Sequence, residues 1–428
     1  MSRSSRFFSF VAIFALFAAA SVDAFAQTAP PRRGPGSPPV RTGSREAGRA
    51  DIRPIPSDRY YRGVKLLEEG DFTKAALFYQ EELRDAVRLG TDQWLDSLCY
   101  YAMLGEACYQ AGELDDALKN FNAALALSLQ YPKWLSRVTY ASGVSTVAKP
   151  ASPWGASRRV VPLGVFPPKA TIVVGDKITQ DRLKKGGAMM EQRAVSIDAA
   201  EIIRCTMLAT RRRGEILGPL APFDPKSEEI LNLYAKRSVP PNHWSITWLD
   251  VLFGIALVQN GRDDDARRVL GEALLMNGQY DHQFTGVALY ELGNLYLAAE
   301  KPREAAECYY EASISAFHYG DRLLVEESLR RYANARRAAR GGSGDPDPVL
   351  RNAYLWAKSH KLALESTSFG LEVAEDMFAA GQTKAAASAL GALNATMKAT
   401  TGRGVCNVRC PGGGRYGDGK ALSPRVLF

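Results

Sequence analysis

The sequence has few of the residues on which metal and disulfide chemistry depends. Its 428 residues include four histidines and six cysteines. No two histidines have the spacing of a metal-binding pair, and no His-Glu-x-x-His motif occurs, so we expect no metal site. The cysteines have no regular spacing, which argues against a disulfide framework. Cys99, Cys108, Cys205 and Cys308 lie among apolar residues of expected helices, where we predict buried thiols.

The motifs of nucleophilic catalysis and nucleotide binding are missing or incomplete. There is no Gly-x-Ser-x-Gly motif. Gly414–Lys420 has the spacing of a phosphate-binding loop, but Ala421 replaces the residue that binds Mg²⁺ and Pro424 prevents a following helix. We therefore predict that the protein is not an enzyme and binds no cofactor. A hydrolase with its catalytic residues in 143–194 is an alternative, although the sequence shows no nucleophile accompanied by a base in that segment.

The apolar run Phe7–Ala20 is short for a membrane span, which needs about 20 residues. Arg3 and Arg6 precede it, and the small-x-small motif Ala24–Ala26 follows. These three parts predict a secretory signal peptide that is cleaved before Gln27. An uncleaved anchor is the alternative. We expect a periplasmic or secreted protein.

The chain is basic, with a formal net charge of +8. In the cytosol such a charge would favour a nucleic-acid partner. For an exported protein we expect no nucleic acid. The anionic neighbours are instead lipid headgroups, cell-wall polymer or an acidic partner protein.

Helix–turn–helix patterns occupy most of residues 57–398. In the stretch 101–125, YAMLGEACYQAGELDDALKNFNAAL, Gly105, Ala117 and Ala124 fall where two antiparallel helices must approach closely, and Phe121 fills the space between them. Small and aromatic residues recur in this way in three further stretches, 60–83, 248–274 and 287–312.

This pattern of Leu-Gly followed by Tyr, Ala, Phe and Ala resembles the tetratricopeptide repeat (TPR). The resemblance implies an all-α, TPR-like superhelical solenoid with a small strand-containing insertion, and a surface that binds other proteins. In TPR proteins the first helix of each repeat lines the concave face. Carried over motif by motif, this implies partner contacts at Glu106, Tyr109, Gln110, Trp248, Gln259, Tyr290 and Asn294.

The helical pattern is interrupted between residues 143 and 195. Arg159–Val161 and Ala170–Val174 are rich in β-branched residues, so we predict two or three short strands that pack on the helices. Helix resumes at Asp198, which has capping-box spacing to Glu201, and again at Asp224, which precedes a proline.

Two basic segments stand out on the expected helices. Arg211–Arg213 lies near the end of one helix, where we expect the arginines to offset the helix dipole and face solvent. In the helix Arg322–Arg340 a short apolar stripe is surrounded by Arg330, Arg331, Arg336, Arg337 and Arg340. A solvated face with Glu326 and Glu327 paired to nearby arginines is our interpretation, and contact with an anionic membrane is the alternative.

These patterns predict an exported, non-catalytic TPR scaffold that mediates protein–protein interaction in the cell envelope. The alternative is a structural protein that adheres to the cell wall or membrane surface through its basic segments. The predicted organisation is a signal peptide (1–26), a disordered Pro/Arg-rich linker (27–56), N-terminal repeats (57–142), a strand-containing insertion (143–195), degenerate and clear repeats (196–340), further helical hairpins (341–399) and a disordered Gly/Arg-rich tail (400–428).

Overall fold

A computed structural model describes residues 54–89, 92–140, 143–167, 170–174, 193–239, 243–340 and 347–401. The predictions of a signal peptide, of most of the linker, and of the C-terminal tail with its loop-like motif at Gly414–Lys420 lie outside these ranges. Within them, no helix is both long and apolar enough to cross a membrane.

The described residues are mainly α-helical, as the sequence predicts. The helices are α1 (Tyr60–Glu68), α2 (Phe72–Arg84), α3 (Asp96–Ala111), α4 (Leu114–Gln130), α6 (Ala199–Leu217), α7 (Pro225–Ala235), α8 (Ile246–Gln259), α9 (Asp263–Glu272), α10 (Thr285–Ala298), α11 (Pro302–His318), α12 (Arg322–Arg340), α13 (Pro348–Ser359), α14 (Ala363–Ala379) and α15 (Thr383–Thr401). Two short 3₁₀ helices are η1 (Leu135–Arg137) and η2 (Gly218–Phe223).

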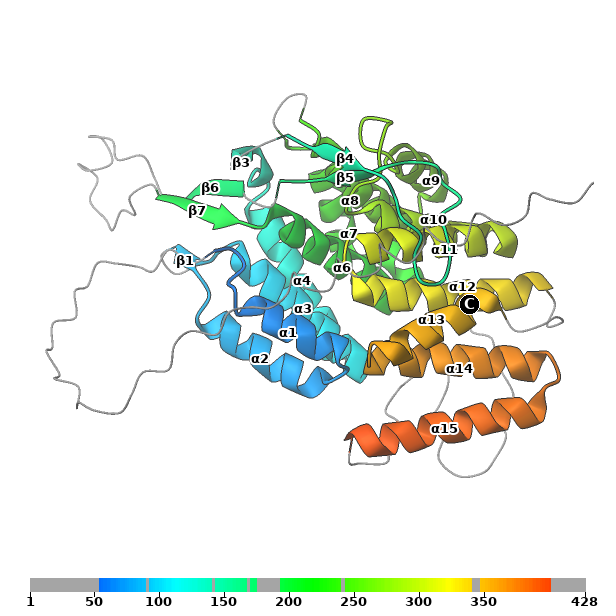
Figure 1. The fold of residues 1–428 in the computed structure, drawn as a ribbon. Coiled ribbons are helices and arrows are strands. Elements are labelled where there is room, and N and C mark those ends of the chain that lie inside the picture. Colours follow the sequence, from blue (N-terminus) through cyan, green and yellow to red (C-terminus); the bar gives the residue numbers. More distant parts are fainter. Residues whose placement is uncertain are drawn as a thin grey trace, which may run out of the picture. The chain divides into compact units, whose positions relative to one another are not determined.

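Neighbouring helices pack as hairpins. Helix α1 packs on α2, α3 on α4, α8 on α9, α10 on α11, and α14 on both α13 and α15 (Figure 1). The hairpins also contact one another, because α3 packs on α6, α6 on α8, and α10 on both α8 and α12. Each helix pair therefore covers apolar surface of the next, as in arrays of structural repeats.

A glycine allows the close approach of the two helices in four of these hairpins. A Cβ atom at Gly105 would lie 2.6 Å from the ring of Phe121, too close for any real contact. The same clash recurs at Gly63 with Tyr79, Gly254 with Leu270 and Gly293 with Tyr309, always sixteen positions apart in the chain. These are the four stretches whose small and large residues predicted hairpins.

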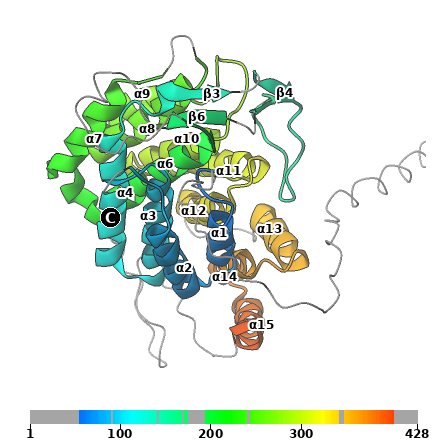
Figure 2. The same ribbon diagram turned by 90° about the vertical axis from the view of Figure 1, so that its left-hand side faces the viewer.

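The strands lie in the interruption that the sequence predicts. β3 (Val138–Tyr140), β6 (Ala170–Val174) and β7 (Arg193–Ile197) form an antiparallel sheet in the order β3-β6-β7. β4 (Ser145–Val147) pairs with β5 (Leu163–Val165), and β1 (Arg88–Leu89) with β2 (Asp92–Gln93), both antiparallel. In both views β3, β4 and β6 lie on the side of the helices away from α15 (Figures 1 and 2).

The predicted strand at Ala170–Val174 is confirmed, but that at Arg159–Val161 is wrong. The backbone N–H of Val161 donates to the carbonyl of Arg159 in a tight turn, and Val160 is 99% exposed. Arg159 instead uses its side chain, which forms an ion pair of 2.8 Å with buried Asp281.

The segment between β4 and β5 is fixed to the helices by buried contacts. Trp154 packs edge-on against Phe317 of α11 and Trp356 of α13, and its Nε1 donates to Ser313 at 3.0 Å. Lys149 lies 2.5 Å from Asp281 in an ion pair that is nearly closed to solvent. The insertion therefore packs on the helices, as expected.

Both predicted helix starts are confirmed. The carboxylate of Asp198 accepts a hydrogen bond from the backbone N–H of Glu201 at 3.0 Å and caps α6. Asp224 caps α7 in the same way by accepting from the N–H of Lys226. Each cap satisfies a donor that the first turn of a helix leaves unpaired.

A pair of Gly→Ala substitutions tests the close approach of the helices. In G105A the methyl group would meet Phe121, which should lower the free energy of unfolding by about 1–3 kcal/mol. G271A is the matched control, because Gly271 of α9 has no atom within 4 Å of an added Cβ. That change should raise stability by about 0.5–1 kcal/mol through helix propensity alone. Equal effects in urea unfolding would contradict the packing described here.

Candidate functional site

Three arginines of α6 lie inside the protein. Arg211, Arg212 and Arg213 are 7%, 4% and 1% exposed. The prediction that they face solvent is therefore wrong. Each forms an ion pair with an acidic side chain: Arg213 pairs with Asp224 at 2.5 Å, and the other two pair with glutamates.

Arg212 joins three helices. Its Nε donates to Oε2 of Glu106 on α3 at 2.8 Å. Its Nη1 donates to Oε1 of Glu327 on α12 and to Oε2 of Glu215, one turn further along α6, both at 2.8 Å. One guanidinium thus links α6 to both α3 and α12, which are far apart in the sequence.

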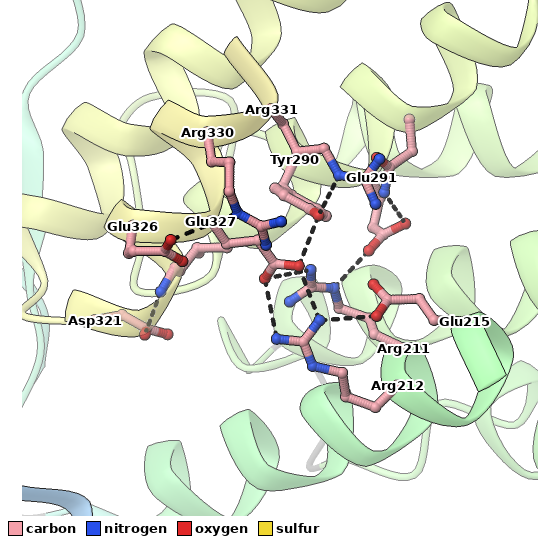
Figure 3. Close-up of polar contacts among 12 residues, drawn as sticks. Arg211, Arg212, Glu215, Tyr290, Glu291, Asp321, Glu326, Glu327, Arg330 and Arg331 are labelled. Carbon is pink, nitrogen blue, oxygen red and sulfur yellow. Dashed lines mark hydrogen bonds and ion pairs between the residues drawn. The ribbon is translucent and has the colours of Figure 1, made fainter. Parts of the chain in front are cut away.

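Arg211 extends these contacts to α10. Its Nε donates to Oε1 of Glu291 at 2.6 Å, and its Nη2 donates to Glu327 at 3.2 Å. Figure 3 shows both α6 arginines pointing toward Glu327, with Arg330 and Arg331 of α12 close by. We call this cluster the arginine–glutamate network: Arg211, Arg212, Glu106, Glu215, Glu291 and Glu327.

Two tyrosines hold the α6 arginines from the side. The Cζ atom of Arg211 lies 4.3 Å from the ring centre of Tyr290, and that of Arg212 lies 4.5 Å from the ring centre of Tyr109. The Tyr290 hydroxyl donates to Glu327 at 2.8 Å, and the Tyr109 hydroxyl to Glu215 at 2.9 Å. Cation–π contacts of desolvated arginines contribute about 2 kcal/mol, so the rings add to the ion pairs.

Burial and charge act in opposite directions on the glutamates. Burial alone would raise the pKa of Glu327, but Arg212 and Arg211 outweigh it and hold that pKa well below its usual range. At Glu291 burial prevails and raises the pKa despite the nearby Arg211. The arginines therefore hold Glu327 in its charged form despite its burial.

Of the residues predicted to contact a partner, Glu106 belongs to the network, and Tyr109 and Tyr290 pack against its arginines. A fourth, Gln110, donates from its Nε2 to Glu106 at 2.7 Å. Asn294 lies nearby on α10 and accepts from the hydroxyl of Tyr309 at 2.7 Å. The structure thus brings these five residues together around contacts within the chain.

The other two predicted residues lie on α8, away from the network. Trp248 is 1% exposed and packs edge-on against Trp244 and Phe284. Gln259 is 5% exposed and lies against Gly214 of α6. Of the seven predicted residues, four are buried and three half-buried in this structure. Their contact with a partner stays a prediction.

Four cysteines and His282 lie among residues of the protein's core or close to it. Cys99, Cys108 and Cys205 are free thiols in the core, which confirms their predicted burial, whereas the free thiol of Cys308 is only half-buried. His282 is fully buried, and its Nδ1 accepts from the backbone N–H of Phe284. Among the described residues, no three His, Cys, Asp or Glu side chains are grouped to hold a metal ion.

The solvated face predicted for α12 is only partly present, since Arg330, Arg331, Arg336 and Arg337 are half-buried. Its apolar stripe is buried, including Leu324, Val325 and Leu329. Arg337 pairs with Glu372 of α14 at 2.6 Å, so it joins two helices. The predicted pairing of Glu326 with Arg330 is present at 3.5 Å, whereas Glu327, also predicted to pair within the helix, pairs with Arg211 and Arg212 of α6.

An accessible cleft of about 570 Å³ lies where α1 meets the starts of α6, α12 and α14; we call it the α1–α14 cleft. Val64, Leu323 and Leu362 give it apolar walls. Arg322 crosses beside it, paired with Glu68 of α1 at 2.8 Å and Glu365 of α14 at 2.6 Å. Figure 2 shows α1, α12 and α14 close together. The sequence patterns gave no sign of this cleft, because its walls come from four separate segments.

Charged residues of both signs also line the α1–α14 cleft: Lys65, Glu68, Glu69, Glu201, Arg204, Asp321, Arg322 and Lys361. Its volume is in the range of about 300–1,000 Å³ that is usual for binding sites.

Substituting Glu327 tests the network through pH. Because the pKa of Glu327 is lower in the folded protein than its ordinary value of about 4.3, its contribution to stability is complete above that pH and is lost as the pH falls below it. E327Q should lower the free energy of unfolding at pH 7 by about 1.5–3 kcal/mol, since it removes a charged hydrogen-bond acceptor from both buried arginines.

Between about pH 5 and pH 3 the stability of E327Q should also fall less than that of the wild type. Denaturant unfolding at a series of pH values measures both effects. D264N is the control, because Asp264 is 98% exposed and should change neither. If the stability of E327Q falls between about pH 5 and pH 3 as steeply as that of the wild type, the assignment of a charge to Glu327 in the folded protein is contradicted.

The comparisons with known proteins are limited to structure. No protein-family model matches the chain, and no curated protein matches it in sequence. One similar solved structure is titled "Crystal Structure of Rap Protein Complexed with Competence and Sporulation Factor". It is 12% identical, and the match covers 80% of this chain and 74% of that chain with a TM-score of 0.38. At this identity and TM-score the match does not indicate what this chain binds.

Proposed function

We propose that the protein is an exported, non-catalytic scaffold that binds a protein or peptide partner in the cell envelope. In this proposal the helix hairpins are TPR-like repeats of a superhelical solenoid. The recurring glycine contacts support it, because the same sixteen-residue spacing builds four hairpins of one kind. Arg3, Arg6 and the motif Ala24–Ala26 support export, although they lie outside the described residues.

The α1–α14 cleft is the observation that carries the proposal. Apolar side chains, Val64, Leu323 and Leu362, form its walls, and charged residues of both signs surround them. Protein interfaces combine an apolar centre with a polar rim in this way. A cleft of about 570 Å³ has room for one or two anchoring side chains of a peptide.

The cleft is also held in place by the fold. Arg322 bridges Glu68 and Glu365, which lie on helices almost 300 residues apart in the sequence. Tyr61, which also lines the cleft, donates from its hydroxyl to Asp198 at 2.8 Å. A site whose walls are fixed before binding loses less conformational entropy when a partner arrives.

Site-specific crosslinking in intact cells tests the proposal. A photo-crosslinking residue in place of Lys65, which lines the cleft, should give a discrete protein adduct in the exported fraction. The same residue in place of Leu77, 58% exposed on α2, should not. V64D puts a charge on the apolar wall and should remove the adduct, with circular dichroism confirming the fold. Identical adducts at both positions, or adducts that V64D leaves unchanged, would contradict partner binding in this cleft.

A further inference from the structure

A second cleft, of about 470 Å³, lies between α11 and α12 beside the loop at Arg158; we call it the α11–α12 cleft. Of the described residues that line it, only Glu307 is acidic. Four are arginines: Arg158, Arg303, Arg336 and Arg340. The lining therefore has a net charge of +3, which attracts an anion.

Carboxylates of the protein form ion pairs with some of these guanidinium groups, but not with every one of their N–H donors. Arg158 pairs with Glu307 at 2.9 Å, and Arg336 pairs with Asp347 through its Nη2, also at 2.9 Å. The Nε of Arg336 is buried and has no hydrogen-bond partner. Arg303 is exposed and, in the part of the chain that the structure describes, makes no ion pair. The guanidinium of Arg303 is thus available to a ligand, and Arg158 and Arg336 each share their charge with one carboxylate.

Aromatic rings and small residues give the cleft a defined form. The rings of Tyr310 and Tyr332 lie 5.9 Å apart on its wall. The Cζ of Arg158 is 5.7 Å from the first ring and the Cζ of Arg336 is 5.8 Å from the second. Stacking on rings restricts a guanidinium, so less entropy is lost when it binds an anion.

We propose that the α11–α12 cleft binds a ligand that carries a phosphate group. A carboxylate is satisfied by one forked guanidinium, whereas a phosphate has three terminal oxygens and a charge of roughly −1.5 to −2 near pH 7. Its charge and its several oxygens suit the exposed Arg303 together with the guanidinium groups of Arg158 and Arg336, which also line the cleft. Ala306 and Ala339 leave room for the rest of the ligand between the helices. This inference does not depend on the proposed partner binding.

Titration calorimetry with inorganic phosphate tests the proposal, with acetate at equal ionic strength for comparison. The wild type should bind phosphate saturably and more tightly than acetate. R303Q and R336Q should each weaken phosphate binding about tenfold or more, the usual effect of losing a hydrogen bond from a charged donor. R303Q breaks no ion pair of the described structure, so a folding defect cannot explain its loss of affinity.

R268Q is the matched control, because Arg268 of α9 pairs within its own helix, with Asp265 and Glu272. It should bind phosphate like the wild type. Failure of the wild type to bind phosphate, equal affinity for acetate, or full affinity in R303Q and R336Q would each overturn the proposal.

Two further probes identify the source of the phosphate. Glycerol phosphate represents a soluble monoester, and phosphatidic acid vesicles, compared with phosphatidylcholine vesicles, represent a lipid that carries a phosphate monoester. Tighter binding to one probe, weakened by the same two substitutions, assigns that source. Vesicle binding that R303Q and R336Q do not change would arise elsewhere on the protein and would count against this cleft.

Discussion

The arrangement of the helices depends on burying two arginines of α6 among glutamates of three other helices. Taking these charges out of water costs several kcal/mol per ion, and only several well-aligned partners offset that cost. Glu327 accepts hydrogen bonds from Arg211, Arg212 and the Tyr290 hydroxyl, so its charge is met from three sides. The network adds little stability over apolar packing. Its effect is to specify which helices meet, because any other pairing would leave a charge buried alone.

This interior arrangement decides which surfaces remain for ligands. Side chains such as Glu106 and Tyr290, on the first helices of their hairpins, are already engaged inside the protein. Two accessible clefts among the described residues lie elsewhere, one where α1 meets α12 and α14 and the other between α11 and α12. The same helix, α12, contributes to both clefts and to the network. A ligand in either cleft would therefore contact α12, whose Glu327 is fixed in the network.

Local features of the fold could be predicted from the sequence, and the network could not. The glycine and ring of each hairpin are sixteen positions apart, and the caps at Asp198 and Asp224 act within three residues. Arg212 and Glu327 are 115 residues apart, so no local pattern relates them. The sequence of three adjacent arginines is the same whether their side chains face water or buried acidic residues. A usable signal was the acid beside each Leu-Gly pair, at Glu106 and Glu291, on helices otherwise rich in apolar residues.

A double-mutant cycle between Arg212 and Glu327 tests the central claim most directly. The free energy of unfolding is measured for the wild type, R212Q, E327Q and the variant with both changes. If the two side chains meet as the structure shows, the loss in the double variant should differ from the sum of the single losses by about 1–3 kcal/mol. Losses that add to within about 0.5 kcal/mol would contradict a direct contact between α6 and α12.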